Sequence, residues 1–184
     1  IPLKIIGRSL SLRGVAVSVQ MSRRAPGRDK TTTPRKESDL PIILSGMLNG
    51  KTTGAPICAI IENKNTKSDD YDNLKFVPRP GHSDFAAYIK YNGNNDIRGG
   101  GHFSGRLTAP LVFAGAVCRQ ILQRRGIFIG AHVYSIGNIE DSPFNPVKIS
   151  KGLLNKLSSA YFAVIDSESE IKMREEIEKA SLAK

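Results

Sequence analysis

The chain has 184 residues, of which 40% are hydrophobic and 24% are charged, and its formal net charge is +10 at pH 7. This length suffices for a domain with a buried core, and the composition is typical of globular proteins. No apolar run approaches the roughly 20 residues that a membrane-spanning helix needs, and the Ile-Pro-Leu-Lys start lacks the pattern of a signal peptide.

The positive charge favours an anionic partner, which can be nucleic acid, anionic lipid or a small polyanionic substrate. Basic residues crowd into 23–36 and 79–125, where glycine and proline interrupt them. This interleaving indicates loops around a site, whereas a DNA-binding helix would carry its basic residues in one continuous stretch.

Two cysteines, Cys58 and Cys118, both lie in apolar runs. We expect two buried, reduced thiols, as in a cytoplasmic protein. They lack the Cys-x-x-Cys spacing of a zinc site, so the sequence predicts no bound metal.

In the first half of the chain, the β-rich runs 42–47 and 56–61 flank Asn49-Gly50, a strong turn signal, and predict a hairpin. Two further short strands are predicted at 3–6 and 15–20. Loops or irregular structure are predicted for the polar, glycine-rich or proline-rich stretches, which are 22–36, 62–73 and 79–101.

In the second half, apolar residues recur at helical spacing over 108–125, and Gly126 predicts the end of that helix. A strand is predicted at 127–136, a turn at 142–146 and a short helix at 150–157. Ser167-x-x-Glu170 predicts a capping box that opens a helix to about Ala180, supported by ion pairs of Lys172 with Glu176 and of Glu175 with Lys179. The fold class is therefore α+β, with residues 1–184 forming a single domain.

The segment Gly99–Arg106 leads directly into the predicted helix at 108–125. Its glycines let the backbone approach a ligand closely, and the helix N-terminus favours a phosphate or a flavin edge. Ser104 and Arg106 add a hydroxyl group and a permanent positive charge. The competing interpretation is a flexible glycine loop that merely precedes a helix.

His82 lies in the loop Arg79-Pro80-Gly81-His82, where it can act as an acid near neutral pH or be an ordinary surface residue. Asp84 and Asp96 can orient His82 or simply solvate their loops. His132 lies in a strand pattern and is predicted to be structural. The loop 23–36 can bind phosphates or carboxylates, or be a solvated charged loop.

A series of motifs resembles the N-terminal half of the chorismate synthase family, in the same order and at the same separations. They include Arg23-Arg24-Ala25-Pro26-Gly27, Thr32-Thr33-Pro34-Arg35-Lys36-Glu37, Gly50–Gly54, Arg79–Asp84, Arg98–Gly101 and Gly101-x-x-Ser104-Gly105-Arg106-x-Thr108. The most specific stretch runs from Arg79 to Val117, and the resemblance covers about residues 20–184.

The resemblance implies a lyase of the shikimate pathway, which leads to the aromatic amino acids. Members convert 5-enolpyruvylshikimate 3-phosphate to chorismate by an anti-1,4 elimination of phosphate, with reduced FMN as cofactor. It also implies a cytoplasmic homotetramer with a duplicated β-α sandwich, of which this chain would be roughly the N-terminal half. The small anionic substrate would account for the positive charge without nucleic acid or membrane as partner.

By the same resemblance, His82 is the catalytic proton donor near the flavin, and Arg35 and Arg106 bind substrate. Cofactor binding is implied for the remaining matched positions: Arg24 and Lys30 toward NADPH as reductant, and His102, Phe103 and Ser104 toward FMN.

Two departures from the family pattern stand out. The family's first histidine motif is replaced by Ile6-Gly7-Arg8-Ser9-Leu10-Ser11, and His102-Phe103-Ser104 replaces the usual Arg-Ser-Ser. The C-terminal half of a family chain is also missing, and half of a sandwich would expose sheet edges and apolar surface. The alternative is therefore a non-catalytic basic module that binds polyanions, or an inactive fragment of that enzyme.

Overall fold

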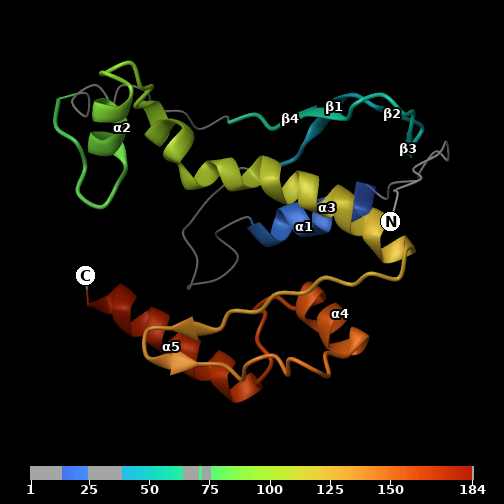
Figure 1. Ribbon diagram of the computed structural model, residues 1–184. Helices are drawn as coiled ribbons and strands as arrows, with labels where there is room; N and C mark the ends of the chain where they lie inside the picture. Colours follow the sequence, from blue (N-terminus) through green and yellow to red (C-terminus); the bar gives the residue numbers. More distant parts are fainter. Residues whose placement is uncertain (1–13, 25–38, 64–70, 72–75, 184) are drawn as a thin grey trace. The chain divides into compact units, whose positions relative to one another are not determined.

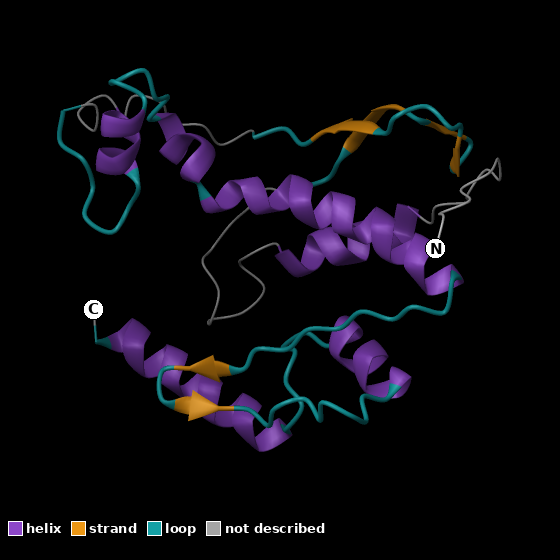
Figure 2. Ribbon diagram, in the orientation of Figure 1, coloured by secondary structure: helices purple, strands orange, loops and turns teal. Residues whose placement is uncertain are grey.

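The computed structural model describes residues 14–24, 39–63, 71 and 76–183 (Figure 1). The chain divides into two units. The first comprises the described parts of Ile1–Arg24 and Glu37–Ala114, and the described residues of the second begin at Gly115. Helices and short strands occur together (Figure 2), which is compatible with the predicted α+β class. The predicted strand at 3–6 lies outside the described residues.

Helix α1 spans Gly14–Arg24, so the strand predicted at 15–20 is wrong, as is the start of the predicted loop at 22–36. The alternating valines of this segment imitate the period of a strand. Among the side chains of α1 that the structure describes, Val17 and Met21 are buried, and they lie four positions apart, on one face of a helix. The buried side chains therefore follow the spacing of a helix and not the two-residue alternation of a strand.

The hairpin prediction is confirmed. Strand β1 (Ile42–Ser45) pairs antiparallel with β4 (Cys58–Ile60), and between them β2 (Met47–Leu48) pairs with β3 (Lys51–Thr52). Asn49 and Gly50 connect β2 to β3 with φ values of 49° and 71°. Two successive positive φ values fit the type I′ turn, whose twist matches that of the flanking strands.

Helix α2 spans Asp84–Lys90 inside the stretch predicted to be mostly irregular, so that prediction is wrong for these seven residues. The irregular part follows at Arg98–Phe103, where three glycines turn the chain with φ values of 62°, 85° and 54°. We call Gly99, Gly100 and Gly101 the glycine loop. Left-handed conformations at three successive residues are costly for any residue with a Cβ atom.

Helix α3 spans Thr108–Arg124, and its predicted position is confirmed. It ends in a Schellman motif: Ile127 N donates to Leu122 O at 3.0 Å, and Gly126 N donates to Gln123 O at 3.1 Å. Gly126 has a φ of 78°, which is the left-handed conformation that this motif requires. Gly126 therefore ends the helix as predicted.

In the second unit, β5 (Ser135–Ile136) and β6 (Ile139–Glu140) form a two-stranded hairpin that contacts α5 (Ser167–Leu182). Only the last two residues of the strand predicted at 127–136 are therefore β-structure. The preceding stretch includes a bond from Val133 N to Ala163 O at 2.7 Å, but this stretch is not part of a ladder. The alternating apolar residues of 127–134 therefore reflect partly buried side chains and not pairing with another strand.

Helix α4 (Lys151–Ser159) confirms the short helix predicted at 150–157. Ser150 is its N-cap, and the Ser150 hydroxyl accepts a bond from Leu153 N. Leu157 on α4 and Met173 on α5 have fully buried side chains, and Val164 between the two helices is also buried. These apolar side chains belong to the core of the second unit.

The N-cap of helix α5 lies one residue earlier than predicted. Its N-cap is Asp166 rather than Ser167, and the Asp166 carboxylate accepts bonds from the N–H groups of Glu168 and Ser169. Lys172 pairs with Glu168, one turn before it in the helix, instead of the predicted Glu176, and Lys179 contacts Glu176 at 4.0 Å. An acidic N-cap at the positive end of the helix dipole is favourable, which explains the shift.

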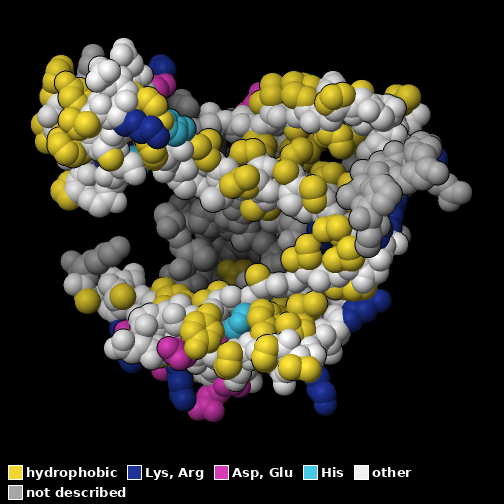
Figure 3. Space-filling view, in the orientation of Figure 1, with side chains coloured by type: hydrophobic (Ala, Val, Ile, Leu, Met, Phe, Trp, Pro, Cys, Tyr) yellow, Lys and Arg dark blue, Asp and Glu magenta, His cyan; other side chains and the backbone are white. Residues whose placement is uncertain are grey.

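Large apolar side chains are exposed in the first unit. All four residues of β1 are exposed, and Figure 3 shows hydrophobic side chains at the surface of this strand region.

Cys58 and Cys118 are free and exposed, so the prediction that they are buried is wrong. Among the described helices, none is both long and apolar enough to cross a membrane.

Candidate functional site

The candidate site is built on the loop from Arg79 to Asp84 and on the glycine loop, both in the first unit. Gly81 turns the first loop with a φ of 73°, and His82 N reaches back to Arg79 O at 3.4 Å. Asp84 then opens α2. Acidic residues are favoured in the first turn of a helix because they complement its dipole.

Three side chains of this loop meet. His82 Nδ1 lies 2.6 Å from Asp84 Oδ1, and the Arg79 guanidinium donates to both carboxylate oxygens, from Nε to Oδ2 at 2.8 Å and from its terminal nitrogen to Oδ1 at 3.0 Å. The Arg79 N–H also donates to Asp84 Oδ2 at 3.1 Å. We call Arg79, His82 and Asp84 the Arg–His–Asp cluster.

The cluster fixes the charge of Asp84. The Asp84 side chain is only 5% exposed, against 24% for His82 and 33% for Arg79. The hydrogen bond from the Arg79 side chain lowers the pKa of Asp84 far below its usual range. Burial opposes this shift, and the Arg79 N–H and His82 add to it. The pKa of Arg79 is raised by the same pair, so both groups are charged at neutral pH.

The glycine loop lies directly against His82. A Cβ atom on Gly100 would be 3.1 Å from His82 Nε2 and 3.4 Å from the Ser104 Cβ atom. His82 and Ser104, both predicted site residues, therefore border one glycine. His82 and Ser104 can approach the backbone this closely only because Gly100 has no side chain.

Arg106 holds the glycine loop against the start of α3. It donates to Gly99 O at 3.0 Å and from Nε to Ser104 Oγ at 3.3 Å. A Cβ atom on Gly99 would lie 1.8 Å from an Arg106 nitrogen, so this bond requires glycine. The guanidinium of Arg106 thereby shapes the loop, whatever else it binds.

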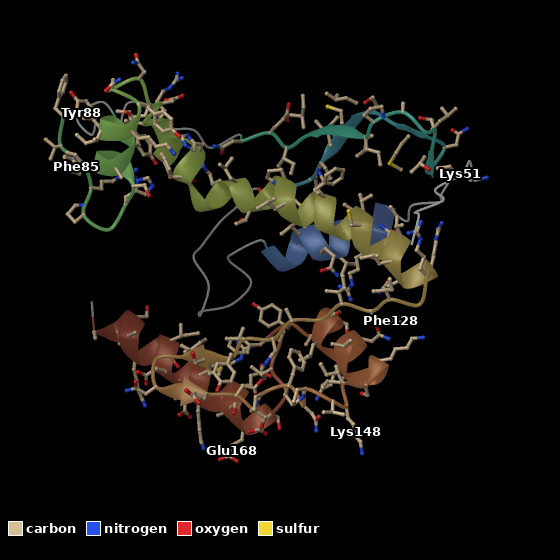
Figure 4. The ribbon with its side chains drawn as sticks, viewed as in Figure 1. Lys51, Phe85, Tyr88, Phe128, Lys148 and Glu168 are labelled. Carbon is tan, nitrogen blue, oxygen red and sulfur yellow. The ribbon has the colours of Figure 1, made fainter. Side chains whose placement is uncertain are left out.

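His102 and Phe103 belong to an aromatic group beside the glycine loop. The ring centroids of His102 and Phe103 are 4.0 Å apart, and Tyr91 meets His102 edge-on at 5.6 Å. Further aromatic side chains, Phe85 and Tyr88, are exposed on α2 (Figure 4). This unit thus presents aromatic surface as well as charge.

The remaining predicted site residues fall elsewhere. Arg24 is the last residue of α1, and Arg35 and Lys30 lie outside the described residues. Asp96, the second candidate for orienting His82, instead pairs with Arg98 at 2.8 Å. Hydrogen bonds from the Arg98 side chain and N–H lower the pKa of Asp96 to about 2.

Sequence reasoning missed the part played by Arg79. The motif Arg79-Pro80-Gly81-His82 suggests a role for its histidine. The contacts of Arg79 with His82 and Asp84, three and five positions later, depend on the turn at Gly81 and are not visible in the sequence pattern. Within the described ranges, no group of three or more His, Cys, Asp or Glu side chains is placed to hold a metal ion.

His132 belongs to a separate arrangement in the second unit. Its Nδ1 lies 2.7 Å from Asp141 Oδ2, and Asp141 also accepts bonds from Ile165 N at 2.7 Å and Asp166 N at 2.9 Å. The Asp141 side chain is 0% exposed and that of His132 7%. This burial fits the structural role that the sequence predicts for His132.

Comparison with known proteins matches residues 6–184 to the family model described as chorismate synthase. Two of the relatives that the chain matches are named chorismate synthase. That of Pyrococcus abyssi is 45% identical over 171 residues, which are 91% of this chain and 46% of the relative. That of Thermococcus kodakarensis is 47% identical over 131 residues, 69% of this chain and 37% of the relative.

A third relative named chorismate synthase, from Chitinophaga pinensis, is 52% identical over 122 residues, which are 66% of this chain and 36% of the relative. The chain thus spans less than half the length of the curated relatives it matches. The family model nevertheless covers nearly all of the chain and both of its units. The chain therefore belongs to the chorismate synthase family.

Proposed function

We propose that the protein functions as a chorismate synthase, a carbon–oxygen lyase of the shikimate pathway. It would eliminate phosphate from 5-enolpyruvylshikimate 3-phosphate, with loss of a C6 hydrogen, to give chorismate. The observation that carries this proposal is family membership over residues 6–184, together with a histidine whose Nε2 atom lies beside a glycine loop.

The charges of the chain suit the proposed substrate. The substrate carries a phosphate and two carboxylates, and the chain has 27 Lys and Arg against 17 Asp and Glu. Arg35 and Arg106 would bind these anionic groups, which also stabilises the leaving phosphate as its charge develops. His82 would donate a proton in the site.

The glycine loop and its neighbours fit a flavin. The absence of a side chain at Gly100 lets His82 and Ser104 approach the backbone of the glycine loop closely, and the His102 and Phe103 rings lie next to each other at its end. His102, Phe103 and Ser104 would hold FMN, and Arg24 and Lys30 would bind NADPH as a reductant. Reduced FMN, when bound, would supply an electron transiently in a reaction without net redox change.

The finer fold and assembly are part of the same proposal. We propose that residues 1–184 form one incomplete domain, roughly the N-terminal half of a β-α sandwich, in a cytoplasmic homotetramer. The exposed apolar side chains of β1 support an additional covering layer, and the free Cys58 and Cys118 suit a reducing compartment.

The decisive experiment measures phosphate release from 5-enolpyruvylshikimate 3-phosphate by the full-length protein, with and without reduced FMN. His82→Ala should lower turnover by about 10²- to 10⁴-fold, as expected for loss of a general acid. Ser83→Ala, next to it in the loop, is the matched control and should retain turnover, because Ser83 makes no side-chain capping bond to α2.

Two outcomes would contradict the proposal. A full-length protein that binds neither FMN nor the substrate would refute the activity itself. If that protein instead bound nucleic acid with a steep salt dependence and had little affinity for flavin, the alternative of a polyanion-binding module would replace it.

A further inference from the structure

The Arg–His–Asp cluster determines which nitrogen of His82 carries the proton in the neutral ring. His82 Nδ1 has two polar neighbours: Asp84 Oδ1 at 2.6 Å and a terminal nitrogen of Arg79 at 3.2 Å. A carboxylate can only accept a hydrogen bond, whereas a guanidinium can only donate one. Nδ1 can therefore satisfy only one of these two neighbours.

The distances decide in favour of Asp84. The contact to the carboxylate is the shorter by 0.6 Å, from 3.2 Å to 2.6 Å, and it joins an N–H to a charged acceptor. The Arg79 nitrogen has its own acceptor, because it donates to Asp84 Oδ1 at 3.0 Å. Nδ1 of His82 is therefore the donor to Asp84.

Arg79 keeps Asp84 in the form that this arrangement needs. It supplies three of the hydrogen bonds that Asp84 accepts, from its backbone N–H, its Nε and its terminal nitrogen. A protonated Asp84 would carry an O–H donor of its own and would no longer be an acceptor-only partner for His82. The arginine thus acts on the histidine through the carboxylate.

The other ring nitrogen is directed to the glycine loop. Nε2 is the His82 atom nearest to the position that a Cβ atom on Gly100 would take. Gly100 is itself buried and has no side chain, so Nε2 packs closely against the backbone of the glycine loop. Nδ1 is committed to Asp84 and the His82 side chain is 24% exposed, so Nε2 is the ring atom that remains to exchange a proton at the glycine loop.

We propose that Asp84 is a positioning residue, which holds neutral His82 as the Nδ1–H tautomer so that Nε2 exchanges the catalytic proton at the glycine loop. When the imidazolium gives up its Nε2 proton, it becomes the neutral ring and keeps the proton on Nδ1, which is hydrogen-bonded to Asp84. A proton that returns to Nε2 restores the imidazolium. Asp84 stays a carboxylate throughout.

The role in catalysis rests on the proposed function, whereas the tautomer does not. Replacing Asp84 by asparagine separates the two. Asp84 Oδ2 accepts from two Arg79 donors, at 2.8 Å and 3.1 Å, whereas Oδ1 accepts from one, at 3.0 Å. The amide oxygen of asparagine therefore belongs on the Oδ2 side, where it keeps two of the three Arg79 bonds. Its NH₂ group then faces Nδ1 of His82, which must accept, and the ring becomes the Nε2–H tautomer.

The test is ¹⁵N NMR of the imidazole rings in the full-length protein labelled at histidine. His82 is assigned by the signal that is lost in His82→Gln. We expect a protonated Nδ1 and an unprotonated Nε2 in the neutral wild-type ring, and the reverse in Asp84→Asn. A wild-type His82 with its proton on Nε2 would overturn the proposal, even if Asp84→Asn does not fold.

Asp96→Asn is the matched control, because Asp96 also pairs with a nearby arginine, but on the surface and with Arg98 rather than His82. It should leave the His82 tautomer unchanged. In the assay of phosphate release, Asp84→Asn should lower kcat by about 10²-fold or more and change KM by less than about threefold.

The outcomes remain distinguishable. An inverted tautomer in Asp84→Asn with unchanged kcat would remove the positioning role. A wild-type protein that shows the Nδ1–H tautomer but forms no chorismate would instead contradict the proposed function, and would limit Asp84 to fixing the ring.

Discussion

Replacing Asp141 by alanine should destabilise the second unit more than any surface substitution near it. Asp141 is completely buried and accepts hydrogen bonds from His132 Nδ1, Ile165 N and Asp166 N, at 2.7 Å, 2.7 Å and 2.9 Å. Alanine removes the acceptor of all three donors at once. The donors remain in place, partly shielded from water.

The magnitude follows from these three donors. A buried donor without a partner costs about 1–3 kcal/mol, and breaking a buried ion pair, which His132 and Asp141 form when His132 is protonated, costs about 3–5 kcal/mol. Since Ile165 and Asp166 are only half-buried, we take the lower value for each donor. Asp141→Ala should therefore lower the free energy of unfolding by about 3–5 kcal/mol, against a total of about 5–15 kcal/mol for a typical domain.

Urea unfolding followed by circular dichroism and tyrosine fluorescence measures this change. The chain has no tryptophan, and Tyr134 meets the His132 ring edge-on at 6.2 Å, so its fluorescence reports on this region. Glu140→Gln, at an exposed neighbour, is the control and should stay within about 0.5 kcal/mol of wild type. A loss below about 1 kcal/mol in Asp141→Ala would refute the reasoning.

Two further predictions concern pH and the glycine loop. Burial opposes ionisation of Asp141, but hydrogen bonds from Ile165, Asp166 and His132 outweigh it and keep its pKa below the ordinary 3.8, so its stabilisation is complete above that pH and is lost as the pH falls below it. Unfolding midpoints should fall more steeply in acid for wild type than for Asp141→Asn, and parallel curves would contradict this. Gly101→Ala would place a Cβ atom 2.1 Å from Asp96 O at a φ of 54°, whereas Gly105→Ala meets nothing within 4 Å. Calorimetry should therefore show a Tm lowered by at least about 4 °C for Gly101→Ala, equivalent to about 1–2 kcal/mol, and an equal Tm for both variants would be the contrary result.

The sequence predicts those elements whose signals are local. Helix α3 has apolar residues at helical spacing over its length and a glycine at its C-terminus, and the β2–β3 turn has Asn49-Gly50. In each case, the residues that fix the conformation are adjacent to it. No distant partner is needed, so the pattern is sufficient.

Elements that depend on burial or on a partner could not be predicted in this way. The valines of α1 alternate as in a strand, and only the burial of Val17 and Met21 reveals a helix. Helix α2 is seven residues long between glycine-rich and proline-rich segments, too short for its periodicity to stand out. The stretch before Ser135 is apolar but has no strand partner over most of its length.

In the candidate site, too, local motifs could be predicted from the sequence, whereas contacts that depend on the backbone path could not. The motifs pointed to His82, Ser104 and Arg106, and the structure brings these three around the glycine loop. The role of Arg79 was not predictable, because it depends on the turn at Gly81 and on the orientation of the Asp84 side chain. Residue types can be predicted from a motif, but the pairing among them requires the backbone path.

The bonds of Asp141 also bear on the order of events in folding. Its partners lie 9, 24 and 25 residues away along the chain, at His132, Ile165 and Asp166. Its carboxylate stays hydrated until all three segments have met, so its contacts should form after the folding transition state. Its loss should therefore act mainly on the rate of unfolding: the protein would still reach its native state at nearly the normal speed, but would leave it sooner.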